Sequence, residues 1–553
     1  MRRTSISRRR FLAVAAAGCA GLAAGAACAP IGQPAPTAQP APQATTAPAA
    51  PAAAQPTAAA APAPTAVPAA TAAPAAVTKG GRLTYGHLGG VLNFDGHRLT
   101  TPNWPIFNLL YNGLIRLDKD MKPQPELAES WQLSDDGLTM TLKLRKGVKF
   151  HNGREFVSED VKLNLERIKD PKTASHPGPL AEVVEKIELP DKYTVVLKLS
   201  RITPNIFDLF DLSYMVAPES VPDLAKKGIG TGPFKLQEFT PGVQSLFVRN
   251  ADYYKPGLPL LDEVLVKVIG EPSGLTIALE SGAVDVVERF LPQEAPRLKT
   301  APGIQVFSVW GGTVADVIIN TRKKPFDNKD LRQAFSLSLN RQRIVDVALA
   351  GAGEAWCLPF PKNSIAYHAD VASGGCKYDL AAAKQALEKA GLASGLEFEL
   401  LVSTTTWSDT VPRAQIWQSD LAQIGVKARI VDAEAADYRE RTWGDKYEVA
   451  MHSFGRANKD PDTLFRGARS WYIKNNFSGF ESEEYTRLVN SAGSTVDTEK
   501  RRAIYKELSK YILDQMFCLT ISPYYYFWGA RSRVQGLTFH SEGTPIYENV
   551  SLA

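Results

Sequence analysis

Residues 451–462 hold the strongest candidates for ligand contact in the chain. The segment brings together a histidine, an arginine, a lysine and two aspartates. We expect a strand over 447–450 just before it, and α/β folds place ligands in loops that follow strand ends. Arg456 either attracts an anionic group of a ligand or faces solvent. His452 is a single histidine, so a metal chelate is a less favoured ligand. The chemistry indicated is reversible binding of a polar solute.

No motif of a catalytic centre accompanies this loop. The sequence lacks GxSxG, HExxH, GxxxxGK[ST] and CxxC, so a hydrolase, metalloprotease or ATPase would have no nucleophile, metal or phosphate cradle. The histidines lack the spacing of metal ligands and are expected on the surface or in loops: His87, His97, His151, His176, His368, His452 and His540. We therefore expect no enzyme, no cofactor and no metal site, and any ATP hydrolysis would belong to a partner.

The first residues read as a targeting segment. The arginines among the first ten residues account for the whole net charge of +5, so the pI near 8.7 does not indicate nucleic acid. Residues 7–12, Ser-Arg-Arg-Arg-Phe-Leu, fit the twin-arginine export pattern, and an apolar stretch follows over 11–24. Cys28 is the favoured lipidation site and Cys19 a competing one. The alternative is a plain cleaved signal with an incidental cysteine.

A low-complexity segment over 29–78 separates this signal from the folded part. It consists mainly of Ala, Pro, Thr and Gln and contains no aromatic residue, so we expect a disordered tether. Three further cysteines remain beyond it. In an exported protein Cys357 and Cys376 either pair in a disulfide or stay free, and Cys518 is expected to be buried in a strand.

The elements that must position the loop alternate between strands and helices. Residues 127–168 predict two strands joined by an Asp136-Gly137 turn, with Leu138, Met140, Leu142 and Leu144 alternating along the second, and then a helix capped by Ser158. Further strands are expected over 82–86, 235–239, 317–320, 396–402 and 426–431. Further helices are expected around 106–110 and over 329–350, 380–390 and 415–423. This pattern indicates an α/β fold.

The sequence of three segments resembles that of the family-5 extracellular solute-binding proteins, which serve ATP-driven importers of peptides, nickel chelates and related solutes. They are LAESWQLSDDGLTMTLKLRKGVKFHNGREFVSEDV from Leu127, GTGPF from Gly230 and KPFDNKDLRQAFSLSLNRQRIV from Lys324. The resemblance implies a two-lobed periplasmic-binding-protein-like fold with mixed sheets, a hinge cleft and a subdomain inserted in the first lobe. The implied divisions are 1–28 signal, 29–78 linker, 79–112, 228–306 and 525–553 lobe I core, 113–227 inserted subdomain, and 307–524 lobe II.

The resemblance also implies where a ligand binds. In the peptide-binding members an acidic residue three positions before the Asp-Pro pair holds the peptide's α-amino group, and here that position is Ala457. The missing carboxylate argues against ordinary peptides with a free N-terminus, because an unpaired buried ammonium costs several kcal/mol. The other cleft positions implied are Trp310, Gly311, Trp407, Arg413, Phe454, Gly455, Arg456 and Asn458.

The expected protein is a lipid-anchored extracytoplasmic receptor, monomeric, that delivers a small polar solute to a permease with cytoplasmic ATPases. The solute is peptide-like, a sugar or oligosaccharide, or anionic. The alternative is a surface interaction protein or an enzyme on the same fold without transport.

Overall fold

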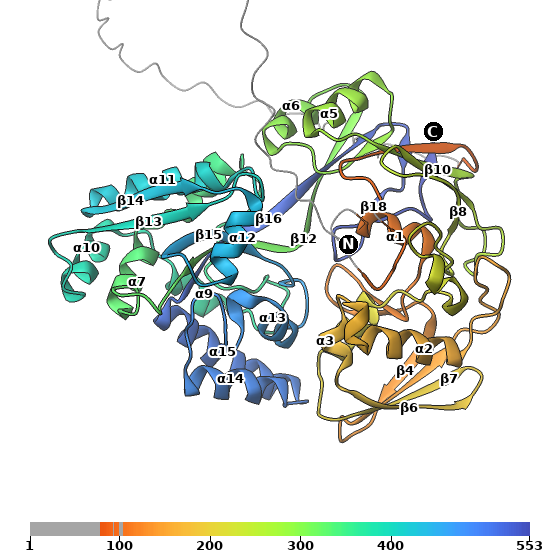
Figure 1. The fold of residues 1–553 in the computed structure, drawn as a ribbon, viewed down its shortest axis with the longest axis horizontal. Coiled ribbons are helices and arrows are strands. Elements are labelled where there is room, and N and C mark those ends of the chain that lie inside the picture. Colours follow the sequence, from red (N-terminus) through yellow and green to blue (C-terminus); the bar gives the residue numbers. More distant parts are fainter. Residues whose placement is uncertain (1–77, 92, 99–102) are drawn as a thin grey trace, which may run out of the picture. The chain divides into compact units, whose positions relative to one another are not determined.

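A ten-stranded sheet connects most of the chain, with strand order β14-β13-β15-β12-β16-β11-β1-β10-β9-β8 (Figure 1). It is seen in a computed structural model that describes residues 78–91, 93–98 and 103–553. The expected signal, both candidate lipidation cysteines and nearly all of the expected linker lie outside the described residues. None of the helices in the described ranges is long and apolar enough to cross a membrane.

One end of this sheet forms the part that we call lobe I, residues 78–111, 224–303 and 532–553. The expected strands at 82–86 and 235–239 are present as β1 and β8. The elements are β1 (Arg82–His87), α1 (Trp104–Leu110), β8 (Phe234–Thr240), β9 (Gln244–Arg249), β10 (Glu263–Val268), α5 (Pro272–Ser281), β11 (Val286–Val287), α6 (Ala295–Lys299), β17 (Val534–Gln535), β18 (Thr538–Phe539), β19 (Pro545–Ile546) and β20 (Ser551–Leu552).

A separate four-stranded sheet, ordered β4-β5-β7-β6, lies within residues 112–223, which we call the inserted subdomain. Its elements are β2 (Ile115–Leu117), β3 (Pro123–Pro125), β4 (Ala128–Leu133), β5 (Thr139–Leu144), α2 (Ser158–Lys169), α3 (Gly178–Ala181), β6 (Val184–Asp191), β7 (Thr194–Leu199) and α4 (Ile206–Leu212). Met140, Leu142 and Leu144 of β5 are buried, as the alternation predicts, whereas Leu138 precedes the strand and is exposed.

The predicted cap of the helix α2 is wrong by one residue. Ser158 is the first helical residue, and its hydroxyl donates to the carbonyl of Asp191 at 2.9 Å. The backbone N–H of Val157 instead donates to the Asp160 carboxylate at 2.9 Å. The acidic residue in the first turn therefore does the capping.

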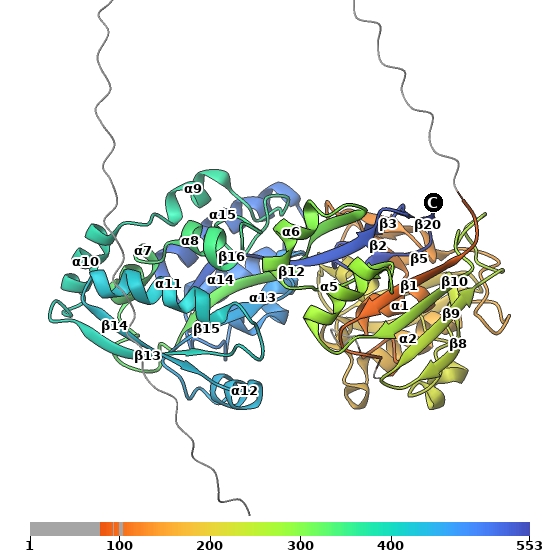
Figure 2. The same ribbon diagram turned by 90° about the horizontal axis from the view of Figure 1, so that it is seen from above.

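Two long antiparallel strands, β12 (Ile304–Ile319) and β16 (Cys518–Arg531), carry the sheet from lobe I to the other end. We call them the crossing ribbon; both views show them side by side (Figures 1 and 2). Their pairing is regular from Ile304 to Trp310 and shifts register between Trp310 and Val314. A second shift follows between Ala315 and Asp316, so the ribbon is continuous through both halves but irregular in its middle.

The other end of the sheet, with the helices around it, forms lobe II, residues 320–517. The expected strands at 396–402 and 426–431 are β13 and β14, which pair in parallel. Its elements are α7 (Lys329–Leu337), α8 (Arg341–Arg343), a π-helical turn (Ile344–Ala348), α9 (Ala369–Gly375), α10 (Leu380–Lys389), β13 (Leu396–Val402), α11 (Thr410–Gln423), β14 (Val426–Asp432), α12 (Ala435–Trp443), β15 (Val449–Phe454), α13 (Pro461–Gly467), α14 (Glu483–Gly493) and α15 (Thr498–Gln515).

Apolar side chains cover both faces of this half of the sheet. Along β12, Val317 points into a cluster with Trp417 of α11, and its neighbour Ile318 points into a cluster with Trp471 on the opposite face. A strand buried on both faces shows no alternation of apolar and polar residues. This explains why β15 extends to Phe454 and not to Ala450 as expected, since all of its residues are buried.

The expected single helix over 329–350 is also wrong. The helix α7 begins after Asn328, whose side chain accepts from the N–H of Asp330 at 2.8 Å, and it ends at Leu337. A second cap at Asn340 accepts from Arg343 N at 3.0 Å and starts α8. Buried Arg341 donates to the carbonyl of Thr520 on β16, which ties the break to the sheet.

The structure decides between the two states left open for Cys357 and Cys376, and it places Cys518 in a strand as expected. Cys357 and Cys376 form a disulfide with their Cα atoms 5.5 Å apart. Cys518 is a free, buried thiol at the start of β16 and donates to the Asp316 carboxylate at 3.1 Å. The disulfide closes a segment between α8 and α10 that supplies Asn363 to the cavity described below.

Candidate ligand-binding site

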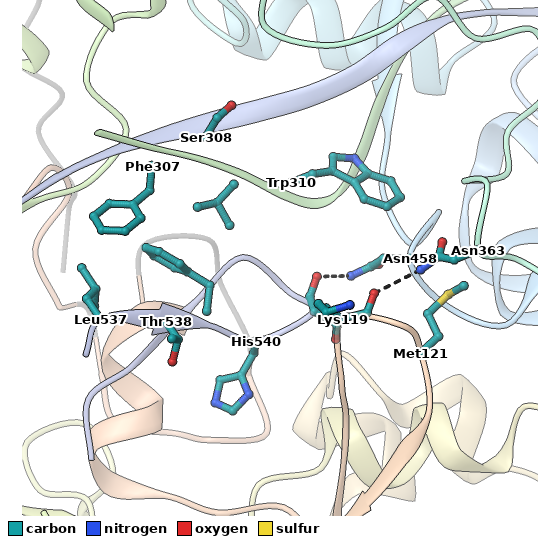
Figure 3. A pocket seen from close by; sticks show the side chains of 13 residues that line it. Lys119, Met121, Phe307, Ser308, Trp310, Asn363, Asn458, Leu537, Thr538 and His540 are labelled. Carbon is teal, nitrogen blue, oxygen red and sulfur yellow. Dashed lines mark hydrogen bonds between the residues drawn. The ribbon is translucent and has the colours of Figure 1, made fainter. Parts of the chain in front are cut away.

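A cavity of about 450 Å³ lies between the crossing ribbon and the C-terminal segment 537–541 (Figure 3). Its apolar wall is formed by the side chains of Phe307, Val309, Trp310, Leu537 and Phe539. Aromatic faces of this kind stack on planar or apolar parts of a solute.

Polar side chains from three parts of the chain also line this cavity. Lys119 comes from the inserted subdomain, Asn363 and Asn458 from lobe II, and His540 from lobe I. The Asn363 amide donates to the carbonyl of Lys119 at 3.1 Å, which joins lobe II to the inserted subdomain across the cavity mouth (Figure 3). A solute held here would touch both lobes.

Trp310, one of the predicted residues, is fixed where the ribbon becomes irregular. Its indole N–H donates to the carbonyl of Thr313 at 2.7 Å, and its ring lies edge-on to Trp356 with centroids 5.4 Å apart. Two glycines follow it. A Cβ on Gly311 would lie 2.5 Å from the carbonyl oxygen of Glu542, and Gly312, at φ +82°, leaves no room for a Cβ beside Asn458. Both glycines therefore permit close approach of neighbouring segments.

The predicted loop after β15 begins at exposed Gly455 and packs against this irregular part of the ribbon. Ala457 is buried, and its N–H donates to the carbonyl of Gly312 at 3.0 Å. The side-chain amide of Asn458 donates to the carbonyl of Ser541 at 2.8 Å, so this residue bridges lobe II and lobe I. The structure thus brings Trp310, Gly311, Ala457 and Asn458 together.

A buried cluster of charges lies next to the loop and was not predicted. The ammonium of Lys459 contacts the carboxylates of Asp211 in the inserted subdomain and Glu542 in lobe I. All three side chains are at most 6% exposed. Burial would raise the pKa of Asp211, but Lys459 and Arg116 outweigh it and hold that pKa below its usual value. The cluster is therefore a charged contact between the lobes.

The other nearby carboxylates are also committed to partners. Asp208 accepts from the hydroxyl of Thr463 at 2.5 Å and from the N–H of Asp460 at 3.0 Å. Burial raises the pKa of Asp208 to about 7, against the opposing effect of Lys459. Asp460 pairs with Arg501 at 2.5 Å. None of these acids is free to take the place of the carboxylate missing at Ala457.

Arg456 differs from its charged neighbours because no described residue forms a hydrogen bond or ion pair with its guanidinium. Its backbone is left-handed at φ +71°, and the guanidinium packs closely against Gly467. Burial lowers its pKa, which Tyr472, Asp208 and Glu542 only partly offset. It is a half-buried cation without a bonded counter-charge.

Two other predicted residues, Arg413 and Phe454, lie deeper than a ligand contact requires, whereas Trp407 does not. Arg413 has no exposed side-chain surface and pairs with Asp409 at 3.0 Å, and Phe454 is 4% exposed and packs against Trp471. Trp407 is half-buried, with its ring edge-on to that of His452. The structure therefore does not support direct ligand contact for Arg413 and Phe454 and gives them the role of supporting the loops.

The expectation that the histidines lie on the surface or in loops is wrong for His87 and His452, which lie in the strands β1 and β15. His87, His97, His368 and His452 are buried. His452 sits in β15 with its Nδ1 3.1 Å from the Asp316 carboxylate, because β15 is longer than predicted. Across the described ranges, no three His, Cys, Asp or Glu side chains are grouped so that they could hold a metal ion.

Known proteins are similar to this chain in both sequence and fold. Residues 122–476 match the model of the bacterial extracellular solute-binding proteins, family 5 Middle. Di/tripeptide-binding protein 1 of Pseudomonas aeruginosa is 30% identical over 449 residues, which cover 74% of this chain and 82% of that protein.

Solved structures agree with this match. The periplasmic binding protein AgaA of A. tumefaciens R10, in complex with agropinic acid, is 27% identical with a TM-score of 0.72, over 86% of this chain and 99% of that one. A Helicobacter pylori periplasmic binding protein in complex with peptide STSA is 25% identical with the same TM-score, over 86% and 98%. These neighbours are two-lobed binding proteins, and the family is one of solute-binding proteins and not of enzymes. The chain belongs to the bacterial extracellular solute-binding proteins of family 5.

Proposed function

We propose that this protein is the extracytoplasmic receptor of an ATP-driven importer and carries a small polar solute to a membrane permease. The observation that supports this most is the cavity between the crossing ribbon and segment 537–541, because lobe I, lobe II and the inserted subdomain all contribute to its lining. A solute that touches both lobes stabilises the state in which they meet.

The proposed mechanism is closure and not catalysis. Asn458 and Lys459 of lobe II bond to Ser541, Asp211 and Glu542 on the other side. These bonds exist only while the lobes are together, so a bound solute and the interlobe bonds reinforce each other. The permease then recognises the closed form, and ATP is hydrolysed by its cytoplasmic partners.

The solute proposed here is small and polar but is not an ordinary peptide with a free N-terminus. Of the relatives named above, one is a di/tripeptide-binding protein, and the two solved structures hold agropinic acid or the peptide STSA. In this chain Ala457 offers no carboxylate, and Asp208, Asp211 and Glu542 are bonded elsewhere. An unpaired ammonium here would cost several kcal/mol. A peptide with a modified N-terminus, a sugar or an anionic solute avoids this cost.

The targeting features complete the proposal. Export through the twin-arginine signal and lipidation at Cys28 would anchor the receptor outside the cytoplasm, and residues 29–78 would act as its tether. As a flexible coil, this tether would reach about 40 Å. Metabolic labelling with a fatty acid, compared between the parent and Cys28→Ser, tests the anchor.

Native mass spectrometry of the purified protein tests the binding function by finding a retained solute. That solute at a hundred times its dissociation constant is expected to add about 2.7 kcal/mol to the free energy of unfolding. Trp310→Ala and Trp407→Ala are expected to weaken its binding without unfolding the protein. Chemical turnover of the solute by the protein, or unchanged uptake in a strain lacking it, would contradict the receptor function.

A further inference from the structure

We infer that the solute carries an uncharged aromatic group that fills the cavity between the crossing ribbon and segment 537–541, with an amide or hydroxyl group next to its ring. This inference rests on the proposed function and narrows its solute. It follows from the shape of the apolar wall, from the charges of the lining and from two side-chain amides at one end of the cavity.

The apolar wall is made by alternation along two stretches of extended chain. Phe307 and Leu537 point toward the cavity, whereas their neighbours Ser308 and Thr538 point away from it (Figure 3). Side chains alternate in this way along a strand, so the polar residues of both stretches are turned out. The cavity therefore has apolar side chains from the ribbon and from the C-terminal segment, against which hydroxyl groups would find no partner.

Neighbouring aromatic side chains hold this wall in place. The ring of Phe539 packs against those of Phe307 and Trp528, with centroids 5.5 and 5.3 Å apart. Trp528 is itself buried in the hydrophobic core of lobe I. Trp310 is fixed by Trp356 and by its indole hydrogen bond. Rings held in this way present flat apolar surfaces before the solute arrives, and a planar ring gains most from them.

The lining offers no charge with which an ionised group could pair. Among its described residues none has a carboxylate, and Arg456 is not part of it; the titratable side chains are Lys119 and His540. Lys119 is 85% exposed and pairs with Asp120 at 3.0 Å, so water and a counter-charge screen it. Burial lowers the pKa of His540 to about 3, so its ring is neutral near pH 7, and it points away from the cavity (Figure 3). An ionised group would therefore lose its hydration in the cavity without gaining a partner.

Two side-chain amides, of Asn363 and Asn458, lie at the Trp310 end of the cavity (Figure 3). Asn363 is exposed, whereas Asn458 is 3% exposed. The nitrogen of each amide donates to a carbonyl, that of Lys119 or that of Ser541. The Oδ1 atoms accept no hydrogen bond from a described residue, and for the buried Asn458 such an unpaired acceptor is uncommon. An N–H or O–H next to the ring of the solute would complete the bonding of these acceptors.

Three small probes of nearly equal shape test the charge and the ring. Benzamide is uncharged, benzoate is anionic and benzamidine is cationic near pH 7, while acetamide keeps the amide without the ring. In ligand-observed NMR titrations, benzamide is expected to bind at least about tenfold more tightly than benzoate or benzamidine, because only the charged probes lose hydration without a partner. Acetamide should not bind at about 10 mM, a concentration that reveals even millimolar affinity.

Two variants locate the binding in this cavity. Trp310→Ala should weaken benzamide binding about tenfold, and exposed Trp443→Ala is its control. Asn363→Asp is an isosteric change at an exposed residue that puts a carboxylate at the polar end, so benzamidine should become the tightest of the three probes. Asn490→Asp, exposed on α14, is the matched control and should keep the order of the parent.

Benzoate or benzamidine binding to the parent as tightly as benzamide would overturn the inference, as would no binding of benzamide at about 10 mM. Equal affinities of the parent and Trp310→Ala for benzamide would overturn it too; if that variant does not fold, an unchanged order of the probes in Asn363→Asp does so. The natural solute separates the two proposals. A retained solute without an aromatic ring contradicts the inference while the receptor function stands, whereas unchanged uptake in the deletion strain contradicts the receptor function, whatever benzamide does.

Discussion

Lys459 is the residue whose replacement should most affect the contact between the lobes. Its ammonium is 1% exposed and contacts Asp211, 3% exposed, and Glu542, 6% exposed. Lys459→Met keeps the length of the side chain but removes the cation that two buried carboxylates share; Glu542 loses its ion-pair partner, and Asp211 keeps only Arg116 at 4.0 Å. Removing one partner of a buried ion pair costs about 3–5 kcal/mol.

Most of this cost should appear in ligand binding, because the partners of Lys459 lie outside lobe II. If the whole cost falls on the state in which the lobes meet, the dissociation constant of the solute rises roughly 100- to 4,000-fold. Isothermal titration with the retained solute measures this change, and small-angle scattering should show a larger radius of gyration for the variant without solute. Lys362→Met is the control, because its pair with Glu354 is 65% and 41% exposed and contributes less than about 1 kcal/mol.

The reasoning is refuted if Lys459→Met stays folded and binds within threefold of the parent with an unchanged radius of gyration. If the variant does not fold, the triple change Lys459→Met, Asp211→Asn and Glu542→Gln decides the matter. Because it leaves no buried charge unpaired, it should recover most of the lost stability. A triple variant as unstable as the single one would show that the charges are not the cause.

Three further predictions follow from the fold. Gly312→Ala should lower the midpoint of thermal unfolding more than Gly147→Ala, because both glycines have positive φ but only Gly312 has Asn458 where a Cβ would stand; equal losses would contradict this. Burial raises the pKa of Asp208 to about 7, so the protonated side chain contributes to the free energy of unfolding fully below its ordinary pKa near 4, and this contribution is lost as pH rises to 7. Asp208→Asn should therefore flatten the fall in the free energy of unfolding over this pH range, measured by chemical denaturation. An unchanged slope in the variant would contradict this prediction. Replacing Cys357 and Cys376 by serine opens a loop of 19 residues and should lower the free energy of unfolding by about 3 kcal/mol in the same assay. Cys518→Ser under reducing conditions is the control. Equal free energies of unfolding for the oxidised parent and the double variant would refute the loop-entropy argument.

Elements with one buried face were predicted well from the sequence, and elements buried on both faces were not. The apolar residues Met140, Leu142 and Leu144 alternate with polar ones, and this alternation predicts the strand β5. All residues of the strand β15 are buried, so they show no alternation of apolar and polar residues, and the sequence predicts a loop over the last of them, including Phe454. The same error placed His452 outside the sheet.

Contacts over long sequence distances account for what was missed in the site. Asp211 lies 248 residues before Lys459, and nothing near either residue indicates the other. The family resemblance is what marks the segments of Trp310 and Asn458, and the departure of Ala457 from the family pattern is what draws attention to Arg456.

The crossing ribbon also determines how the molecule can move. Both of its strands continue from one half of the sheet into the other, so opening the lobes must twist the ribbon without breaking a secondary-structure element. The twist will concentrate where the ladder of hydrogen bonds is already irregular, between Trp310 and Val314. Gly311 and Gly312 lie in this stretch, where neighbouring segments leave no room for a Cβ. Substitutions at these glycines would therefore change the free energy needed to close the lobes, and with it the rate of solute release, although neither residue would touch the solute.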